Sequence, residues 1–213
     1  MRRLPIIALV CVLAACGGKS GTKTTTNAAG CVPMTAPAAA SRTGKKPTAP
    51  LDATKTYDVT MQTNCGTFTI QLDQKESPNA TASFVALTQA GYFDKTIFHR
   101  IVPGFVIQGG DPTASGTGGP GYTTVDKPPA DAKYTLGVVA MAKTGAQPAG
   151  AAGSQFFIVT VANAGLPPDY AIIGTVTSGL GVVKRIGKLG NASDPNGTPT
   201  EVVEIEKATV STS

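Results

Sequence analysis

Tryptophan is absent from this 213-residue sequence, and histidine occurs only once, at position 99. A single histidine excludes a metal site built from several histidines. Four cysteines are too few for a scaffold that depends on many disulfides. Charged residues make up 15% of the chain and hydrophobic residues 41%. This balance excludes a disordered chain, and the low content of charged residues disfavours long surface helices.

The formal net charge of +5 suggests a nucleic-acid partner at first sight, but the charges are unevenly distributed. Residues 1–55 hold eight basic side chains and one acidic side chain, whereas residues 56–213 hold ten basic and twelve acidic ones. All twelve aromatic residues lie between Tyr57 and Tyr170, within this mildly acidic part. We therefore expect a folded domain over residues 56–213 and no nucleic-acid partner.

The N-terminus has the order of a secretory signal peptide. Arg2 and Arg3 precede an apolar run over residues 4–15, which is too short to span a bilayer as a helix. The sequence Leu-Ala-Ala-Cys at 13–16 resembles the lipobox of bacterial lipoproteins. The resemblance implies a signal peptide over 1–15 and acylation of Cys16, which would anchor the chain to the outer face of the cell membrane. The alternatives are an ordinary signal peptide with a chance cysteine, or a buried core segment.

Residues 16–55 are rich in Gly, Ser, Thr, Ala, Lys and Pro and contain no aromatic residue. This composition predicts a flexible tether that spans roughly 35 Å and holds a domain away from the membrane. Cys31 lies in this tether and Cys65 lies in the domain. Outside the cytoplasm an even pair of cysteines favours a disulfide, which would contribute about 4 kcal/mol in the chain-entropy model. Two independent thiols are the alternative.

The domain has the pattern of a mainly β protein. Residues 57–61 and 67–73 alternate polar and apolar side chains around a predicted turn at 64–66, and a second alternating segment surrounds Val203 and Ile205. Three apolar runs of strand length occur at 136–142, 156–161 and 171–176. Two helices are predicted, one that begins after Ser77 as its cap and ends near Gly91, and one over 180–186 that ends at Gly187. Many strands with two helices indicate a closed antiparallel barrel with capped ends.

Two common catalytic or cofactor motifs are excluded. Residues 116–121 match the dinucleotide pattern GxGxxG, but they include a proline and lead into no predicted helix. No serine lies in a GxSxG elbow, and the single His99 gives little support to a Ser-His-Asp triad.

The informative segment is FHRIVPGFVIQGGD at residues 98–111, followed by GSQFFI at 153–158. Together with GYFD at 91–94 and LGVVAMA at 136–142, these motifs resemble the cyclophilin family of peptidyl-prolyl isomerases over about residues 57–210. The resemblance implies a mainly β fold, a closed eight-stranded antiparallel barrel capped by two α-helices. It also implies that no cofactor is needed.

The chemistry of this family needs an apolar slot for the proline ring and a donor that favours the twisted amide, because rotation about an amide faces a barrier of about 18–20 kcal/mol. By resemblance Arg100 is this donor, Gln108 orients it and the substrate backbone, and Phe105 completes the catalytic set. The resemblance places the remaining substrate-binding residues at Val106, Ala142, Gln155, Phe157, Leu166 and Tyr170. The alternatives are core positions for the two phenylalanines and a solvated surface position for the arginine. His99 is expected to be structural.

Three positions depart from many eukaryotic cyclophilins. Gly165 stands where a rim tryptophan is common, Tyr170 where a pocket histidine is common, and Val106 where a methionine is common. These departures bear on the choice of substrate sequence and leave the Arg-Gln-Phe set intact.

These observations predict a monomeric isomerase that acts on proline-containing polypeptides and assists the folding of exported proteins at the cell envelope. Two alternatives remain open. One is an envelope-tethered module that binds proline peptides with little turnover. The other is a solute-binding lipoprotein, although the domain is too short for the usual two lobes.

Overall fold

The alternating polar and apolar residues at the start of the domain form its first two strands. The computed structural model describes residues 25–213, so the predicted signal peptide and Cys16 lie outside the described residues. Strand β1 (Tyr57–Thr63) pairs with β2 (Gly66–Leu72) in an antiparallel hairpin. Val59, Met61 and Ile70 are fully buried and lie on one face of the pair, as the period of two predicts.

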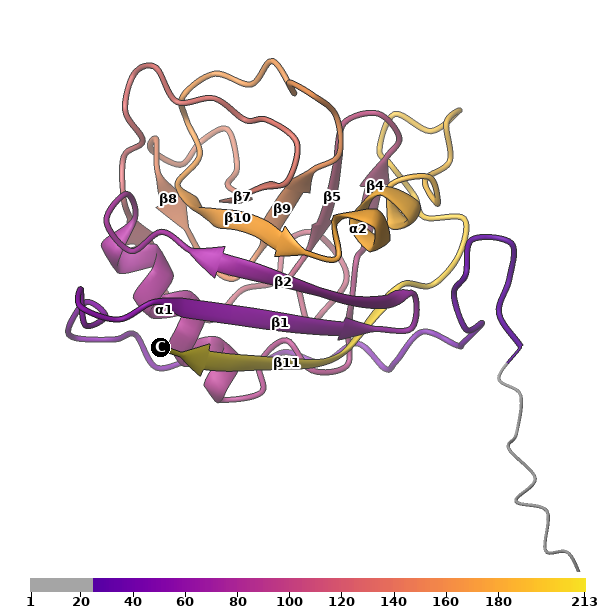
Figure 1. Cartoon of the computed structure of the whole chain (residues 1–213), viewed down its shortest axis with the longest axis horizontal. Coiled ribbons are helices and arrows are strands. Elements are labelled where there is room, and N and C mark those ends of the chain that lie inside the picture. Colours follow the sequence, from indigo (N-terminus) through magenta and orange to yellow (C-terminus); the bar gives the residue numbers. More distant parts are fainter. Residues whose placement is uncertain (1–24) are drawn as a thin grey trace, which may run out of the picture.

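Within residues 25–213 the main sheet contains nine strands, all paired antiparallel, in the order β3-β11-β1-β2-β10-β7-β9-β5-β4 (Figure 1). The remaining strands of this sheet are β3 (Thr96–Ile97), β4 (Arg100–Val102), β5 (Val106–Gly109), β7 (Val138–Met141), β9 (Phe156–Val159), β10 (Ile172–Ser178) and β11 (Glu204–Thr212). A separate pair joins β6 (Thr124–Val125) to β8 (Ala151–Ala152).

The two edge strands of the main sheet, β3 and β4, follow one another in the chain with only Phe98 and His99 between them. The chain itself therefore joins the two edges, and the sheet curls into a barrel. The predicted mainly β barrel fold is confirmed. The difference from the expected eight strands arises because the segment 96–102 forms two very short strands, one at each edge.

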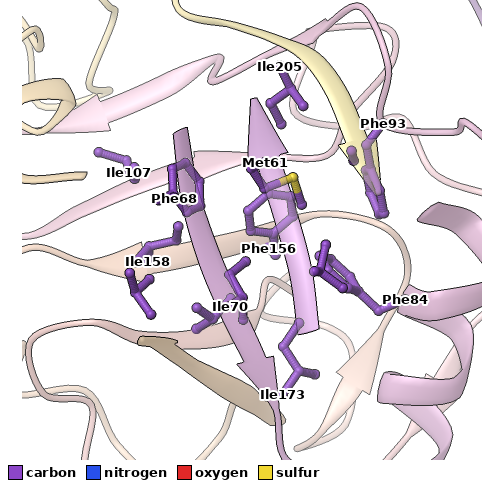
Figure 2. Close-up of a cluster of buried hydrophobic side chains, with 14 of the residues drawn as sticks. Met61, Phe68, Ile70, Phe84, Phe93, Ile107, Phe156, Ile158, Ile173 and Ile205 are labelled. Atoms are coloured by element: carbon purple, nitrogen blue, oxygen red, sulfur yellow. The ribbon is translucent and has the colours of Figure 1, made fainter. Parts of the chain in front are cut away.

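The main core fills the inside of the barrel and draws side chains from nearly every strand (Figure 2). Phe156 lies at its centre, with edge-to-face contacts to Phe84, Phe93 and Phe98 at ring-centroid distances of 5.3, 5.9 and 6.0 Å. Aromatic rings in this arrangement each add about 0.5–1.5 kcal/mol beyond the apolar area that they bury.

Both predicted helices are confirmed: α1 is Pro78–Gln89 and α2 is Leu180–Ile186, with Gly187 as the residue that ends α2. Ser77 is the N-cap residue of α1 and proline follows it at the start of the helix, as predicted, but the Ser77 side chain makes no capping hydrogen bond. The Asp126 carboxylate takes this place, accepting hydrogen bonds from the backbone N–H of Ala80 (2.6 Å) and from the Asn79 side chain (2.7 Å). Neither helix within residues 25–213 is long and apolar enough to cross a bilayer.

Residues 25–55 differ from the expected flexible tether. They form no helix or strand, yet they follow the outside of the domain, beginning near the turn between β1 and β2 (Figure 1). Cys31 is buried and forms a disulfide with Cys65, as predicted. The backbone N–H of Val32 donates to Asn64 (2.8 Å), and the Asn64 side chain donates back to Val32 (2.9 Å). The composition of residues 25–55 could not predict these bonds, because their partners, Asn64 and Cys65, lie more than 30 positions further along the sequence.

Replacing Asp126 by alanine leaves the first turn of α1 without an acceptor for the Ala80 N–H. We expect a loss of about 1–2 kcal/mol in the free energy of unfolding, the usual cost of losing a helix cap. Urea unfolding of Asp126→Ala measures this loss. The exposed Asp131→Ala serves as control and is expected to unfold like the unaltered chain. An Asp126→Ala variant as stable as this control would contradict the capping role.

Candidate active site

A row of side chains crosses the outer face of the barrel wall. Arg100 on β4 is in register with Gln108 on β5, Gln108 with Phe157 on β9, and Phe157 with Ala140 on β7. Directly opposed residues in an antiparallel sheet point to the same face. The register therefore places a cation, an amide and an aromatic ring side by side on three neighbouring strands.

A second apolar cluster, separate from the main core, covers this face. Its buried members include Val106, Tyr134, Phe157 and Val159. Leu166 and Tyr170, from the segment between β9 and β10, pack against them. The cluster surrounds a cavity of about 250 Å³, which is lined by Arg100, Phe105, Val106, Gln108, Ala142, Lys143, Phe157, Leu166 and Tyr170. The fold thus brings together in one cavity every predicted catalytic or substrate-binding residue except Gln155.

Arg100 is held by the turn that precedes β11. Its Nε donates to the carbonyl of Asn196 (3.1 Å), while the backbone N–H of the next residue, Ile101, donates to Gly197 (2.7 Å). Asp194 closes the turn through the N–H of Asn196 (2.8 Å). Within residues 25–213 the two terminal NH₂ groups of Arg100 have no hydrogen-bond partner, so they are free to donate to a bound ligand.

Gln108 is held differently from the sequence expectation. Its side-chain amide donates to Gln155 (3.0 Å), and no hydrogen bond joins it to Arg100 in the part of the chain that the structure describes. Gln155 in turn donates to the carbonyls of Gly116 and Gly118, both at 2.9 Å. The expectation that Gln108 orients Arg100 is therefore wrong for this state. Register alone places the two side chains together, and Arg100 is oriented by Asn196.

Gln155 lies beside the apolar cavity and lines a second one of about 640 Å³. The second cavity is bounded by the glycine-rich segment 116–123 and shares Gln108, Ala142 and Lys143 with the first. The two cavities therefore adjoin each other. The first is walled mainly by apolar side chains, and the second mainly by glycines, hydroxyls and amides.

Buried Asp111 anchors the wall of the second cavity. Its carboxylate accepts from the backbone N–H groups of Thr113 (2.7 Å), Gly116 (2.7 Å) and Gly118 (3.1 Å). Burial alone would raise the pKa of Asp111, but these hydrogen bonds outweigh it and hold the pKa below its ordinary value. The ionised carboxylate therefore fixes the two carbonyls that orient Gln155.

Sequence reasoning missed Lys143. Its side chain is only 5% exposed, because its ammonium forms an ion pair with Asp169 (2.6 Å) and lies 5.6 Å from the centre of the Tyr170 ring. The same ammonium donates to the carbonyl of Gln147 (3.2 Å). One sequence signal could have indicated Lys143, because it directly follows Ala142, a predicted substrate-binding residue. Its burial depends on Asp169, which is 26 residues away in the sequence.

Within residues 25–213, no three His, Cys, Asp or Glu side chains are grouped so that they could hold a metal ion. His99 neighbours Arg100 and is largely buried. Burial lowers the pKa of His99, the Arg100 charge lowers it further, and Asp111 opposes both effects. The folded protein therefore favours the neutral imidazole, which agrees with the expected structural role.

This lowered pKa predicts a pH dependence of stability. An unfolded histidine takes up a proton near pH 6.5, whereas folded His99 does so only at lower pH. The unfolded state thus binds more protons in this interval, so the free energy of unfolding falls as the pH drops through 6.5 toward the folded pKa. Urea unfolding between pH 7.5 and 5 measures the effect. We expect a smaller decrease in His99→Gln, and an equal decrease in both proteins would contradict it.

Comparison with known proteins places this geometry in a family. Residues 58–210 match the sequence model described as cyclophilin type peptidyl-prolyl cis-trans isomerase/CLD. The peptidyl-prolyl cis-trans isomerase-like 1 protein of Neurospora crassa is 39% identical over 157 residues, which cover 72% of this chain and 93% of that protein. The isomerase ppi1 of Schizosaccharomyces pombe is 38% identical over 155 residues, 71% of this chain and 97% of that protein.

Solved structures agree. The crystal structure of a cyclophilin type isomerase from Cryptosporidium parvum has a TM-score of 0.66 and 32% identity, and the match covers 73% of this chain and 98% of that one. A second crystal structure of that protein was determined in the presence of the dipeptide Ala-Pro, with a TM-score of 0.65. These relatives are eukaryotic and give no support to a bacterial lipoprotein context. The chain belongs to the cyclophilin family of peptidyl-prolyl cis-trans isomerases.

Proposed function

We propose that this chain catalyses X-Pro isomerisation in the 250 Å³ cavity, with Arg100 as the catalytic cation. The observation that carries the proposal is a guanidinium at the edge of an apolar cavity whose terminal NH₂ groups have no hydrogen-bond partner among residues 25–213. The cis and trans isomers of an X-Pro bond differ by only about 0.5–1 kcal/mol, so a catalyst needs to change only the barrier. As the amide twists, its nitrogen regains a lone pair that a cation can stabilise.

Each wall of the cavity has a role in this mechanism. Phe105, Val106, Phe157 and Leu166 enclose the pyrrolidine ring, and Tyr170 closes the side next to Lys143. Gln108 offers its free amide atoms to the substrate backbone while Gln155 holds it in place. Ala142 and Gln155 border the second cavity, which receives the residues before proline. No step needs a proton transfer, which suits a site whose neighbouring imidazole is buried and neutral.

Arg100→Ala removes the cation from the twisted amide. We expect kcat/KM for an Ala-Pro peptide to fall by about a hundredfold or more, the scale of one lost transition-state donor. Arg185→Ala is a matched control, because Arg185 on α2 also donates to a backbone carbonyl, that of Cys65 (3.1 Å), and lies outside both cavities. A folded Arg100→Ala variant with unchanged turnover would show that the charge has no catalytic role.

We further propose that the isomerase acts on exported proteins at the outer face of a cell membrane, anchored through Cys16. The support is the lipobox-like sequence at 13–16, together with the Cys31–Cys65 disulfide, because disulfides persist in oxidising compartments. Asn27 bonds to Glu201 of the domain, so the chain from Cys16 to Asn27 can reach at most about 40 Å. The domain would then work close to the membrane surface.

Cys16→Ser removes the thiol that this proposal needs. We expect the variant to lose metabolic fatty-acid label and to accumulate as an unprocessed precursor, while its isomerase activity after purification stays unchanged. Cys31→Ser serves as the control: it retains Cys16 and should therefore keep the fatty-acid label. Continued lipid labelling and membrane fractionation of Cys16→Ser would contradict the anchor.

A further inference from the structure

Residues 40–46 of the N-terminal segment lie against the outer side of the loop that walls the second cavity. The backbone N–H of Ala40 donates to Pro112 (3.0 Å), and that of Gly44 donates to Pro120 (2.9 Å). The Lys46 ammonium donates to the carbonyl of Thr123 (2.9 Å). A side chain at Gly44 would collide with Leu87 at 2.5 Å, which shows how closely the segment approaches the domain.

The loop has little other support at this place. In the part of the chain that the structure describes, residues 119–123 take part in three hydrogen bonds. One joins Tyr122 to Ser83 (2.9 Å), and the other two come from Gly44 and Lys46. Gly119 and Gly121 lie in this stretch, and glycines leave a backbone with wide conformational freedom unless hydrogen bonds restrict it.

Arg42 fixes the segment to the domain. Its guanidinium donates to the carbonyls of Tyr92 (2.6 Å), Asp94 (2.7 Å) and Gly91 (3.5 Å), just after the end of α1. All three contacts are made by one terminal nitrogen, Nη1, which carries two hydrogens, so the two short bonds to Tyr92 and Asp94 are the ones that hold the segment. The Tyr92 hydroxyl accepts a hydrogen bond from Ser154 (3.3 Å), the residue before Gln155. Arg42 therefore ties the segment to the turn after α1, and Tyr92 of this turn contacts Ser154 in the wall of the second cavity.

We propose that residues 40–46 are a positioning element of the isomerase site: they brace the loop 112–123 and so set the shape of the cavity for the residues before proline. The family match covers residues 58–210 and does not include this brace. The inference rests on the proposed function, because it assumes that the residues before proline occupy the 640 Å³ cavity.

The test compares two substrates in the full-length chain. A blocked Ala-Pro dipeptide fills the apolar cavity and places one alanine at the border between the two cavities, whereas a peptide with four residues before proline extends into the braced one. For Arg42→Ala we expect KM for the long peptide to rise about three- to tenfold with kcat nearly unchanged, the scale of one net hydrogen bond. The dipeptide should be turned over as before. Arg42→Lys should restore part of the loss.

Two controls separate bracing from general destabilisation. Lys46→Ala and Lys45→Ala remove the same charge from neighbouring exposed positions, yet only Lys46 bonds to the loop. We expect a raised KM for the long peptide in Lys46→Ala alone. The double variant Cys31→Ser/Cys65→Ser weakens the segment away from the brace and should leave both substrates unaffected.

The possible outcomes are distinct. If the unaltered chain turns over neither substrate, the proposed function fails and the brace fails with it. If it turns over both, but Arg42→Ala changes neither substrate or changes both equally, the isomerase function stands and the brace is overturned. Limited proteolysis within residues 112–123 gives an independent readout, since the proposal requires faster cleavage in Arg42→Ala than in Lys45→Ala.

Discussion

The structure depends on one strand that is buried on both faces. In β9 (Phe156–Val159) alternate side chains point in opposite directions, so Phe156 and Ile158 enter the main core while Phe157 and Val159 enter the second cluster. The same strand therefore forms part of the barrel wall, between β7 and β5, and builds the floor of the candidate site. Because it is packed from both sides, the site lies on a rigid wall of the barrel, as a preorganised catalyst requires.

The charged and polar side chains of the site stand on this wall but are oriented by groups outside it. Register places Arg100 and Gln108 beside Phe157, but their orientation comes from loops: the turn at Asn196 for the arginine, and the loop anchored by Asp111 for the glutamine, through Gln155. An apolar cavity next to free guanidinium donors suits a reaction that rotates a bond and transfers no proton. The site thus combines a fixed apolar floor with polar groups whose positions depend on loops.

The sequence predicted the features that depend on short-range pattern. The hairpin, both helices and the main apolar strands follow from periodicity. The linked motifs identified every residue that lines the apolar cavity except Lys143. Features that depend on distant partners were missed. Asp126 caps α1 from 46 residues away, and Arg42 docks the segment 25–55 in addition to the predicted disulfide. Its small polar residues carry no periodic pattern that predicts docking.

The central claim is that a proline ring binds against Phe157 and isomerises there. Exchange NMR of an Ala-Pro peptide with a substoichiometric amount of the purified chain tests this most directly. The account predicts cis–trans exchange peaks that are absent from the free peptide, with magnetisation transfer between the pyrrolidine ring and the side chains of Phe157 and Leu166. Unchanged exchange, or transfer from the ring to residues of another surface, would contradict it.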